Sequence, residues 1–454
     1  MAMHGFNRPQ VNIGRSSFES VPEDELDFDM DSDTPQGGLA GQFGDEMSKL
    51  DLSNMISQQW KVIFNALCDP RVSECEINGP ESVFLMVNGQ REPLGKTVGR
   101  PIGWGDITDF QNTMKDVETH SAHFGADYKD AYCIWEGGLR LKDLNNRLKV
   151  KARFHCVKPP VCEFPLVTIA KQSTSLTSLD AIQRSGSMTP EMKMFIQVLV
   201  KSKQTIIFSG GTGAGKTTFM SACCTEMDPR ERVGIYEDAP ELDIHEHVPN
   251  SINMMSFPAA PGMQANEQAD LDWCVRQAQR QRVDRILVGE SRGSEFASFI
   301  IAANSGFNGS MTTLHANNPR MALDKMAGFL KRAPGNASTP MSSINNDLAM
   351  SINYIIQLER VKLHNGSKGY RVTSIEEISN IVGSDEAAKV KTQPIFQYSY
   401  ETDNWRLVNY PEDDEMREAL TKIHNSPHAH SNNPALNGGG GGVPVDRQSF
   451  MRRR

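Results

Sequence analysis

Short apolar runs alternate with helix-forming segments between about residues 189 and 383. The runs at 205–208 and 286–288 are rich in β-branched and other apolar residues and are bounded by polar loops, as expected of strands buried on both faces. Thr189 and Pro190 have the residue types of an N-cap and first helical position, and they open a helix that leads into the first of these strands. The alternation predicts an α/β domain with a mostly parallel sheet and helices on both of its faces.

The part of the chain that precedes this domain has a different pattern. Helical spacing of apolar residues predicts helices at 47–66 and 107–119, whereas short alternating runs predict strands within 72–94 and 131–169. These elements indicate a smaller α+β domain, followed by a Ser/Thr-rich connecting stretch at 173–186. We therefore predict four segments: a disordered acidic tail (1–45), an α+β N-terminal domain (46–178), the α/β domain with its linker (179–410) and a flexible His/Asn/Gly-rich tail with a short charged helix (411–454).

Composition narrows the class of protein. The chain has 454 residues and a net charge of -9, which is not typical of a general nucleic-acid binder. It has no apolar run of membrane-spanning length and no signal-peptide core, so we expect a cytoplasmic protein. Its eight cysteines include no C-x-x-C pair, so a zinc module is not predicted.

The stretch after the strand at 205–208 has the spacing G-x-x-x-x-G-K-[ST]. Glycines let the backbone fold around a phosphate chain, and the start of the next helix adds a positive end. The lysine supplies a charge for the β- and γ-phosphates, and the following hydroxyl can bind Mg²⁺. The motif predicts an ATP site with Mg²⁺, in which the binding residues are Gly210, Gly211, Thr212, Gly213, Ala214, Gly215, Lys216, Thr217 and Thr218.

Three polar clusters follow, each at the end of a predicted strand. Glu237 ends the first, Glu290 the second and His315 the third. Because the carboxyl ends of parallel strands meet at one edge of a sheet, these side chains are expected near the phosphates. Either acid can orient or deprotonate the attacking water, and Glu290 can also hold the hydration shell of Mg²⁺; the sequence does not divide these roles. His315 is a candidate contact of the γ-phosphate.

Arginines precede the second acidic strand. Arg276 and Arg280 are four residues apart and share a helix face, with Arg282 and Arg285 close behind. Phosphoryl transfer needs positive groups that stabilise the negative charge of its transition state, so Arg276 and Arg280 are candidate nucleotide contacts. In a ring of subunits, they could reach the nucleotide of a neighbouring subunit. The alternative is a solvated surface.

The combined motifs resemble those of the secretion ATPases that power type IV secretion, tight-adherence pili and type II export. The resemblance rests on SGGTGAGKTT, IYEDAPEL, RQAQRQRVDRILVGESRG, GFNGSMTTLHANNP and, before them, EINGPESVFLMVNG and RFHCVKPPV. It implies a RecA-like ATPase domain with Glu237 in an acidic box, Glu290 as the Walker B acid and His315 in a histidine box. It also implies that Arg153, and more weakly Arg140, reach nucleotide from the N-terminal domain. Lys171 stands where relatives carry an arginine, and it lacks the bidentate fork of that residue.

The same resemblance implies a homohexameric ATP hydrolase at the cytoplasmic face of the inner membrane. Its partners would be inner-membrane components of a type IV secretion or tight-adherence machine, with membrane association through those partners and no stable binding of nucleic acid. The expected function is to couple ATP hydrolysis to secretion of protein or DNA, or to pilus assembly. A pilus retraction motor, an ATP-gated adaptor with little turnover and a nucleic-acid translocase are the alternatives.

Overall fold

The structure is a computed structural model of the whole chain. It describes residues 63, 66–79, 82–88, 90–94, 134–142, 148–157, 159–172, 178–239, 241–242, 244–256, 269–363, 366, 368–382 and 389–429. The acidic N-terminal tail, the helix expected at 107–119 and most of the helix expected at 47–66 lie outside these residues. The chain divides into two compact units, one of residues 1–121 with 139–171 and one of residues 122–138 with 172–454.

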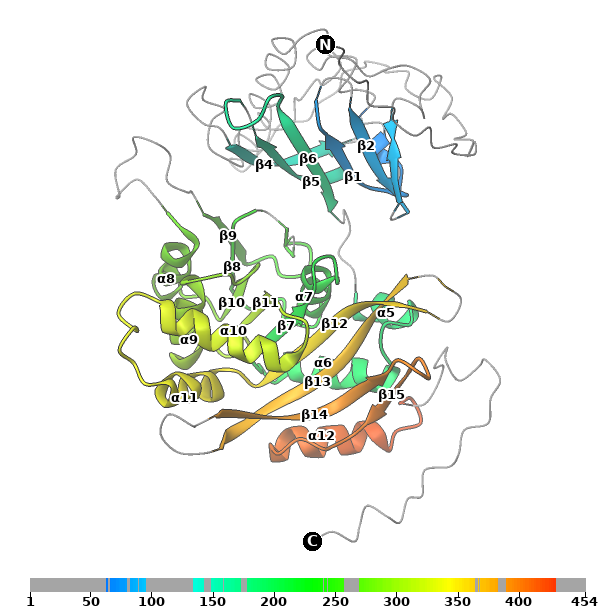
Figure 1. Ribbon diagram of the computed structural model, residues 1–454. Coiled ribbons are helices and arrows are strands. Elements are labelled where there is room, and N and C mark those ends of the chain that lie inside the picture. Colours follow the sequence, from blue (N-terminus) through cyan, green and yellow to red (C-terminus); the bar gives the residue numbers. More distant parts are fainter. Residues whose placement is uncertain are drawn as a thin grey trace, which may run out of the picture. The chain divides into compact units, whose positions relative to one another are not determined.

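The first unit is built on a six-stranded sheet with the order β3-β2-β1-β6-β5-β4 (Figure 1), although the division by residue range assigns the first five residues of β4 and the last residue of β6 to the second unit. Alternate residues of β2 are buried and half-exposed, which is the pattern of a strand with one face on a core. The strands predicted within 72–94 and 131–169 are thus confirmed. They are β1 (Val72–Ile77), β2 (Val83–Val87), β3 (Gln90–Pro93), β4 (Ile134–Lys142), β5 (Leu148–Val157) and β6 (Leu166–Gln172).

The second unit is built on a nine-stranded sheet with the order β15-β14-β13-β12-β7-β11-β10-β8-β9. Neighbours from β12 to β9 run parallel, and β13, β14 and β15 continue the sheet in antiparallel pairs. The predicted parallel sheet is confirmed, with an antiparallel extension beside it. The strands are β7 (Ile206–Gly210), β8 (Val233–Glu237), β9 (Ser251–Met255), β10 (Arg285–Val288), β11 (Met311–His315), β12 (Tyr354–Lys362), β13 (Lys368–Val382), β14 (Lys389–Ser399) and β15 (Asn404–Leu407).

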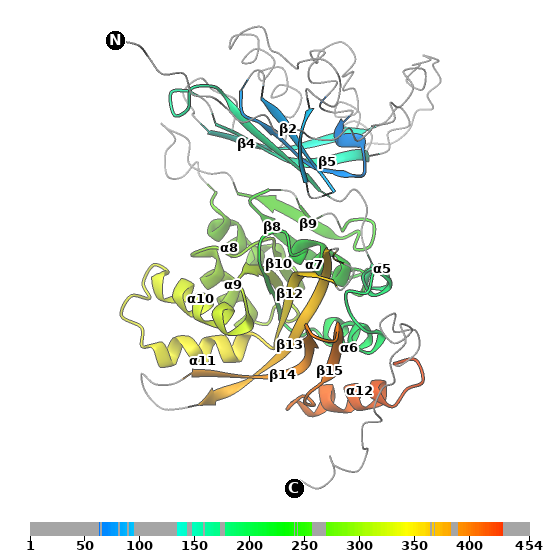
Figure 2. The ribbon, with the colours of Figure 1, turned by 45° about the vertical axis from the view of Figure 1, so that its right-hand side comes forward.

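Helices cover both faces of this sheet, as predicted (Figure 2). Successive residues of β7 point to opposite faces, so Ile206 and Phe208 join one core and Ile207 joins the other. The first core includes α6, α7 and α12, and the second includes α8, α9, α10 and α11. The helices are α5 (Leu179–Arg184), α6 (Pro190–Lys201), α7 (Lys216–Cys224), α8 (Leu271–Gln281), α9 (Glu295–Asn304), α10 (Pro319–Arg332), α11 (Met341–Ser351) and α12 (Asp414–His424). This doubly covered sheet confirms the α/β fold class.

The helix start at Thr189 is also confirmed. The Thr189 side chain accepts a hydrogen bond from the Met192 amide, and Pro190 occupies the first position of α6. The connecting stretch at 173–186 differs from the prediction because its second half forms α5, which is capped by the side chain of Ser178. That helix is too short for apolar periodicity to reveal it.

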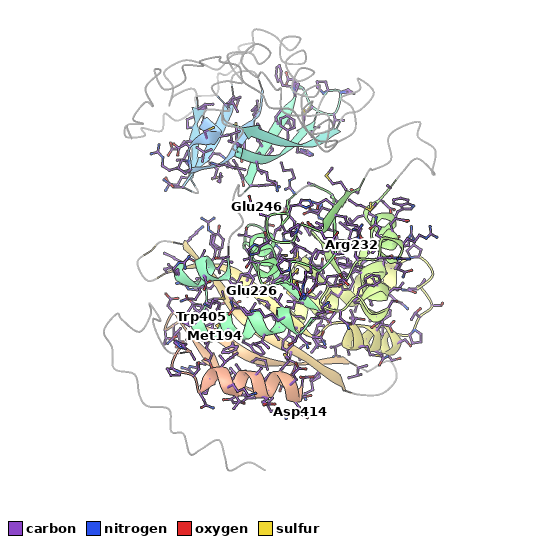
Figure 3. All side chains as sticks on the ribbon, turned by 180° about the vertical axis from the view of Figure 1, so that it is seen from behind. Met194, Glu226, Arg232, Glu246, Trp405 and Asp414 are labelled. Atoms are coloured by element: carbon purple, nitrogen blue, oxygen red, sulfur yellow. The ribbon has the colours of Figure 1, made fainter. Side chains whose placement is uncertain are left out.

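The segment after residue 410 also differs in part from the expected flexible tail. Helix α12, which begins at Asp414 in Figure 3, buries Met416 and Leu420 in the core that contains α6. His424 Nδ1 lies 2.6 Å from Glu191 Oε1 of α6. The charged outer face of the helix obscured its docking in the sequence, and the residues from 430 onward lie outside the described part.

The described residues contain no helix that is long and apolar enough to cross a membrane. Within the same residues, no group of three or more His, Cys, Asp or Glu side chains could hold a metal ion. The adjacent Cys223 and Cys224 are buried in α7, where they pack in the core as small apolar residues.

Candidate nucleotide-binding site

The predicted phosphate loop joins the end of β7 to the start of α7. A Cβ on Gly210 would lie 2.4 Å from the carbonyl oxygen of Leu358 on β12, so only glycine allows the two strands this approach. Gly215 has a φ of 83°, in the left-handed region, and it caps α7 without a side chain. The backbone thus turns sharply into the helix, and the amides of the first turn face the loop, as an anion requires.

Lys216 begins α7 and is 6% exposed. Its Nζ donates to the carbonyl oxygen of Gly211, at 2.9 Å, and lies 3.3 Å from His315 Nδ1. Burial lowers the pKa of Lys216, while the nearby Glu290 and Glu241 carboxylates oppose that shift. Within the described part of the chain, the ammonium has hydrogen-bond contacts with a carbonyl and an imidazole, and a phosphate would be a stronger partner.

His315 ends β11 and is paired in register with Gly210. Its Nε2 lies 3.2 Å from Glu290 Oε1, and its Nδ1 faces the Lys216 ammonium. Burial and the Lys216 charge lower the pKa of His315, which favours the neutral ring. Because the ammonium can only donate, Nδ1 is the acceptor and the proton is on Nε2, directed at the carboxylate. His315 therefore links Lys216 to Glu290.

Glu290 follows β10 and also accepts a hydrogen bond from Arg292 Nη2 to its Oε2, at 2.8 Å. Burial alone would raise the pKa of Glu290, but the Arg292 hydrogen bond and the charges of Arg292, His315 and Lys216 lower it. The carboxyl group is consequently ionised at neutral pH. The predicted meeting of Lys216, Glu290 and His315 at one edge of the sheet is found in the structure.

Glu237 ends β8 and is 2% exposed. Its Oε1 accepts hydrogen bonds from the amides of Glu241 and Leu242, at 3.2 and 2.9 Å. A Cβ on Gly289 would lie 3.0 Å from Glu237 Cγ, so the side chain packs against the residue that precedes Glu290. Glu237 therefore lies beside the site and holds the loop that leaves β8.

The polar residues of β11 have structural contacts. Thr313 Oγ1 donates to the Gly289 carbonyl at 2.8 Å, and Thr312 Oγ1 lies 2.8 Å from Ser291 Oγ. Both threonines are buried. They fix the end of β11 against the end of β10, and this sets the separation of His315 and Glu290.

The arginines before β10 are not at the phosphate loop of their own chain. Arg276 is exposed and pairs with Asp272 one turn earlier on α8. The carbonyl of Gln281 at the end of α8 accepts from Nε of Arg232, which is labelled in Figure 3 and directly precedes β8. This contact places the C-terminal turn of α8, with Arg280, at the amino-terminal ends of the parallel strands. The phosphate loop lies at their carboxyl-terminal ends, so Arg280 is on the other side of the sheet's length from it.

Arg285 has a different role from its neighbours in the sequence. It is fully buried at the start of β10, and its Nε lies 2.5 Å from Glu231 Oε2. Arginines that are close in the sequence therefore differ in burial: Arg285 lies in the core, whereas Arg280 and Arg282 lie on the surface.

The N-terminal cations are described only within their own unit. Arg153 lies on β5 with an exposed side chain, and Arg140 lies on β4 with a side chain outside the described residues. Lys171 Nζ donates to the Asp69 carbonyl at 2.8 Å, and burial lowers the pKa of Lys171. Lys171 is therefore engaged with the backbone of its own unit.

The residues at the loop fit a nucleoside triphosphate with Mg²⁺. Thr217, at the second position of α7, carries a hydroxyl, and Glu290 supplies an ionised carboxylate. Hydroxyl, carboxylate and phosphate oxygens are the hard donors that Mg²⁺ prefers. Thr217 and Glu290 are the residues that would hold the ion.

Comparison with known proteins gives the family of the chain. The sequence profile described as "Type II/IV secretion system protein" matches residues 142–397, which is more than half of the 454 residues. The chain belongs to this family.

Relatives within the type II/IV secretion system family include a putative conjugal transfer protein of Mycobacterium tuberculosis, 30% identical over 214 residues. That match covers 46% of this chain and 57% of the relative, so the chain spans little more than half of that protein. The type IV secretion system protein VirB11 of Brucella suis is 28% identical over 325 residues, covering 66% of this chain and 83% of VirB11. A solved structure of the Legionella pneumophila ATPase DotB is 16% identical with a TM-score of 0.47, covering 77% of this chain and 83% of DotB.

The sequence did not single out two residues that complete the site in this family member. Arg292 pairs with Glu290, and Gln357 of β12 donates from Nε2 to the Ala316 carbonyl at 3.2 Å. Because β7 lies between β12 and β11 in the sheet, this hydrogen bond spans the end of β7. A lone glutamine in the apolar strand 354–358 was the available signal, since a buried amide must be paired.

Proposed function

We propose that this protein is an ATP hydrolase that couples turnover to transport or pilus assembly. The observation that carries the proposal is the chain of contacts from Lys216 through His315 to Glu290 beside a glycine loop at the start of α7. A cation, a neutral imidazole and an ionised carboxylate around one anion site are the groups that phosphoryl transfer needs.

The residues have separate roles in the proposed reaction. The loop amides hold the phosphate chain, and Lys216 exchanges the Gly211 carbonyl for oxygens of the terminal phosphates. Mg²⁺, when bound, neutralises charge on those oxygens. Glu290 orients the attacking water and accepts its proton, which its ionised state permits. His315 keeps the carboxylate in place through Nε2–H and exposes Nδ1 once Lys216 turns to the phosphate.

Glu237 remains a second candidate acid in this proposal. Its position against Gly289 supports a role in setting the height of the loop that carries Glu290. Arg276 and Arg280 would act on nucleotide only from another subunit. Arg153 and Arg140 are the contacts that the N-terminal unit would supply.

The names of the relatives support a proposal about the larger assembly. The family description and the name of VirB11 both refer to secretion systems, and the M. tuberculosis relative is named for conjugal transfer. We therefore propose a homohexameric ring that associates with the cytoplasmic face of the inner membrane through components of a type IV secretion or tight-adherence machine.

Steady-state ATP hydrolysis by the purified chain tests the proposal. Replacing Lys216 with Ala should lower turnover by about 100-fold or more, because the transition-state charge loses its mobile cation. Lys201→Ala is the matched control, since Lys201 ends α6 and is an exposed partner of Glu226. Equal turnover in all three proteins would refute the proposal.

A further inference from the structure

The strand pair β12–β13 extends past the phosphate loop. Leu358 of β12 is the register partner of Gly210, and β12 continues to Lys362. At about 3.3 Å per residue, this extension reaches roughly 13 Å beyond the end of β7. Its antiparallel partner β13 accompanies it from Lys368 onward (Figure 1). The pair forms a wall beside the loop.

Tyr370 of β13 is the aromatic residue on this wall nearest the loop. A Cβ built on Gly215 would lie 3.6 Å from Tyr370 Cδ1 and 3.8 Å from Cε1. The residue is nevertheless 46% exposed. The ring thus lies beside the last loop glycine, which directly precedes Lys216, and keeps much of its surface exposed.

The contacts of Tyr370 do not explain why its ring is partly exposed. Tyr370 shares a strand face with Val372, which is fully buried in the core around α6 and α7. Arg360 is its cross-strand partner, with the guanidinium carbon 5.9 Å from the ring centroid. Such an exposed cation–π pair contributes little to stability, so it does not by itself explain an aromatic side chain at this position.

We infer that Tyr370 is the platform on which the purine base of the nucleotide stacks. The inference rests on the proposed function, because it takes the phosphates to lie in the loop 210–217. The nucleoside must leave that loop from the start of α7, where Gly215 and Tyr370 meet. An aromatic ring binds the π-face of a base without regard to its hydrogen-bonding edge, and Arg360 supports the ring from the neighbouring strand.

A purely structural role makes a different prediction. If Tyr370 only supported Gly215, its loss would deform the phosphate loop and weaken every ligand held by its phosphates. A stacking role affects only ligands that carry a base. Inorganic tripolyphosphate, which has the phosphates alone, therefore separates the two.

Calorimetric titration of the full chain with a non-hydrolysable ATP analogue and with tripolyphosphate tests the inference. Tyr370→Ala should weaken binding of the ATP analogue by about 5- to 150-fold, the range of one lost base–aromatic stack, and leave binding of tripolyphosphate within about twofold. Tyr370→Phe should restore binding, because the π-face is kept. Tyr400→Ala is a matched control, since Tyr400 is also exposed and its hydroxyl donates to Glu359.

Two results would overturn the inference: an equal loss for both ligands, or no loss for the ATP analogue in Tyr370→Ala. A wild-type chain that bound neither ligand would instead refute the nucleotide site itself, and the inference with it. The two failures are therefore distinguishable.

Discussion

The two acids at the sheet edge should respond differently to substitution. Glu290 contacts His315 through Oε1 and Arg292 through Oε2, so a glutamine at that position keeps one acceptor oxygen for His315 and loses the ion pair with the half-exposed Arg292. Glu290→Gln should therefore change stability by less than about 1 kcal/mol, as for a partly exposed ion pair. It removes the base, so turnover should fall about 100- to 10,000-fold.

Glu237 should show the reverse behaviour. Its Oε1 accepts from the buried amide of Leu242 and from the part-buried amide of Glu241, so Glu237→Ala removes an acceptor from both. A buried donor that loses its acceptor costs about 1–3 kcal/mol, and the free energy of unfolding should fall by about that amount because of the Leu242 amide. Glu237→Gln keeps an acceptor oxygen and should retain most of the stability and turnover.

Urea denaturation and steady-state ATPase assays on the same preparations measure both quantities. The assignment is refuted if Glu290→Gln hydrolyses ATP at the wild-type rate. It is also refuted if Glu237→Gln remains folded but loses as much turnover as Glu290→Gln, because Glu237 would then be the base.

Three further predictions concern the scaffold of the site. The pKa of His315 is lowered from 6.5, so its contribution to stability is present above pH 6.5 and is lost as pH falls through its folded pKa. His315→Gln should therefore reduce the fall of the melting temperature below pH 6.5. An unchanged dependence of the melting temperature on pH would contradict this. Gly210→Ala puts a Cβ 2.4 Å from a carbonyl oxygen of β12, so the free energy of unfolding should fall by about 1–3 kcal/mol, measured by denaturation. Wild-type stability in this variant would argue against the close approach of the two strands. Arg285→Ala leaves Glu231 without its buried partner and should lower the free energy of unfolding by about 3–5 kcal/mol, measured by denaturation. Adding Glu231→Gln should recover part of that loss. No recovery in the double variant would refute the pairing.

The sequence predicted the parts of the fold that depend on local pattern. Apolar strand runs, the Thr189 cap and the glycine spacing each depend on a few neighbouring residues, so the strand predicted at 205–208 lies within two residues of the observed bounds of β7. The convergence of Glu290 and His315 was predicted because parallel strands bring their ends to one edge.

The remaining features depend on contacts between distant segments. Arg285 reads as one more surface arginine, yet Glu231 lies 54 positions earlier and pairs with it in the core. Tyr370 and Gly215 are likewise far apart in the chain, and only the register of β12 with β7 and β13 brings them together. Helix α12 shows a charged composition and two buried residues, which is too weak a signal for its docking on α6.

The central claim is tested most directly by a structure of the full chain with Mg²⁺ and a non-hydrolysable ATP analogue. We predict that Lys216 Nζ leaves Gly211 and His315 to contact the terminal phosphates, with Glu290 facing the position of the attacking water. A terminal phosphate bound away from Lys216, Glu290 and His315 would contradict the account.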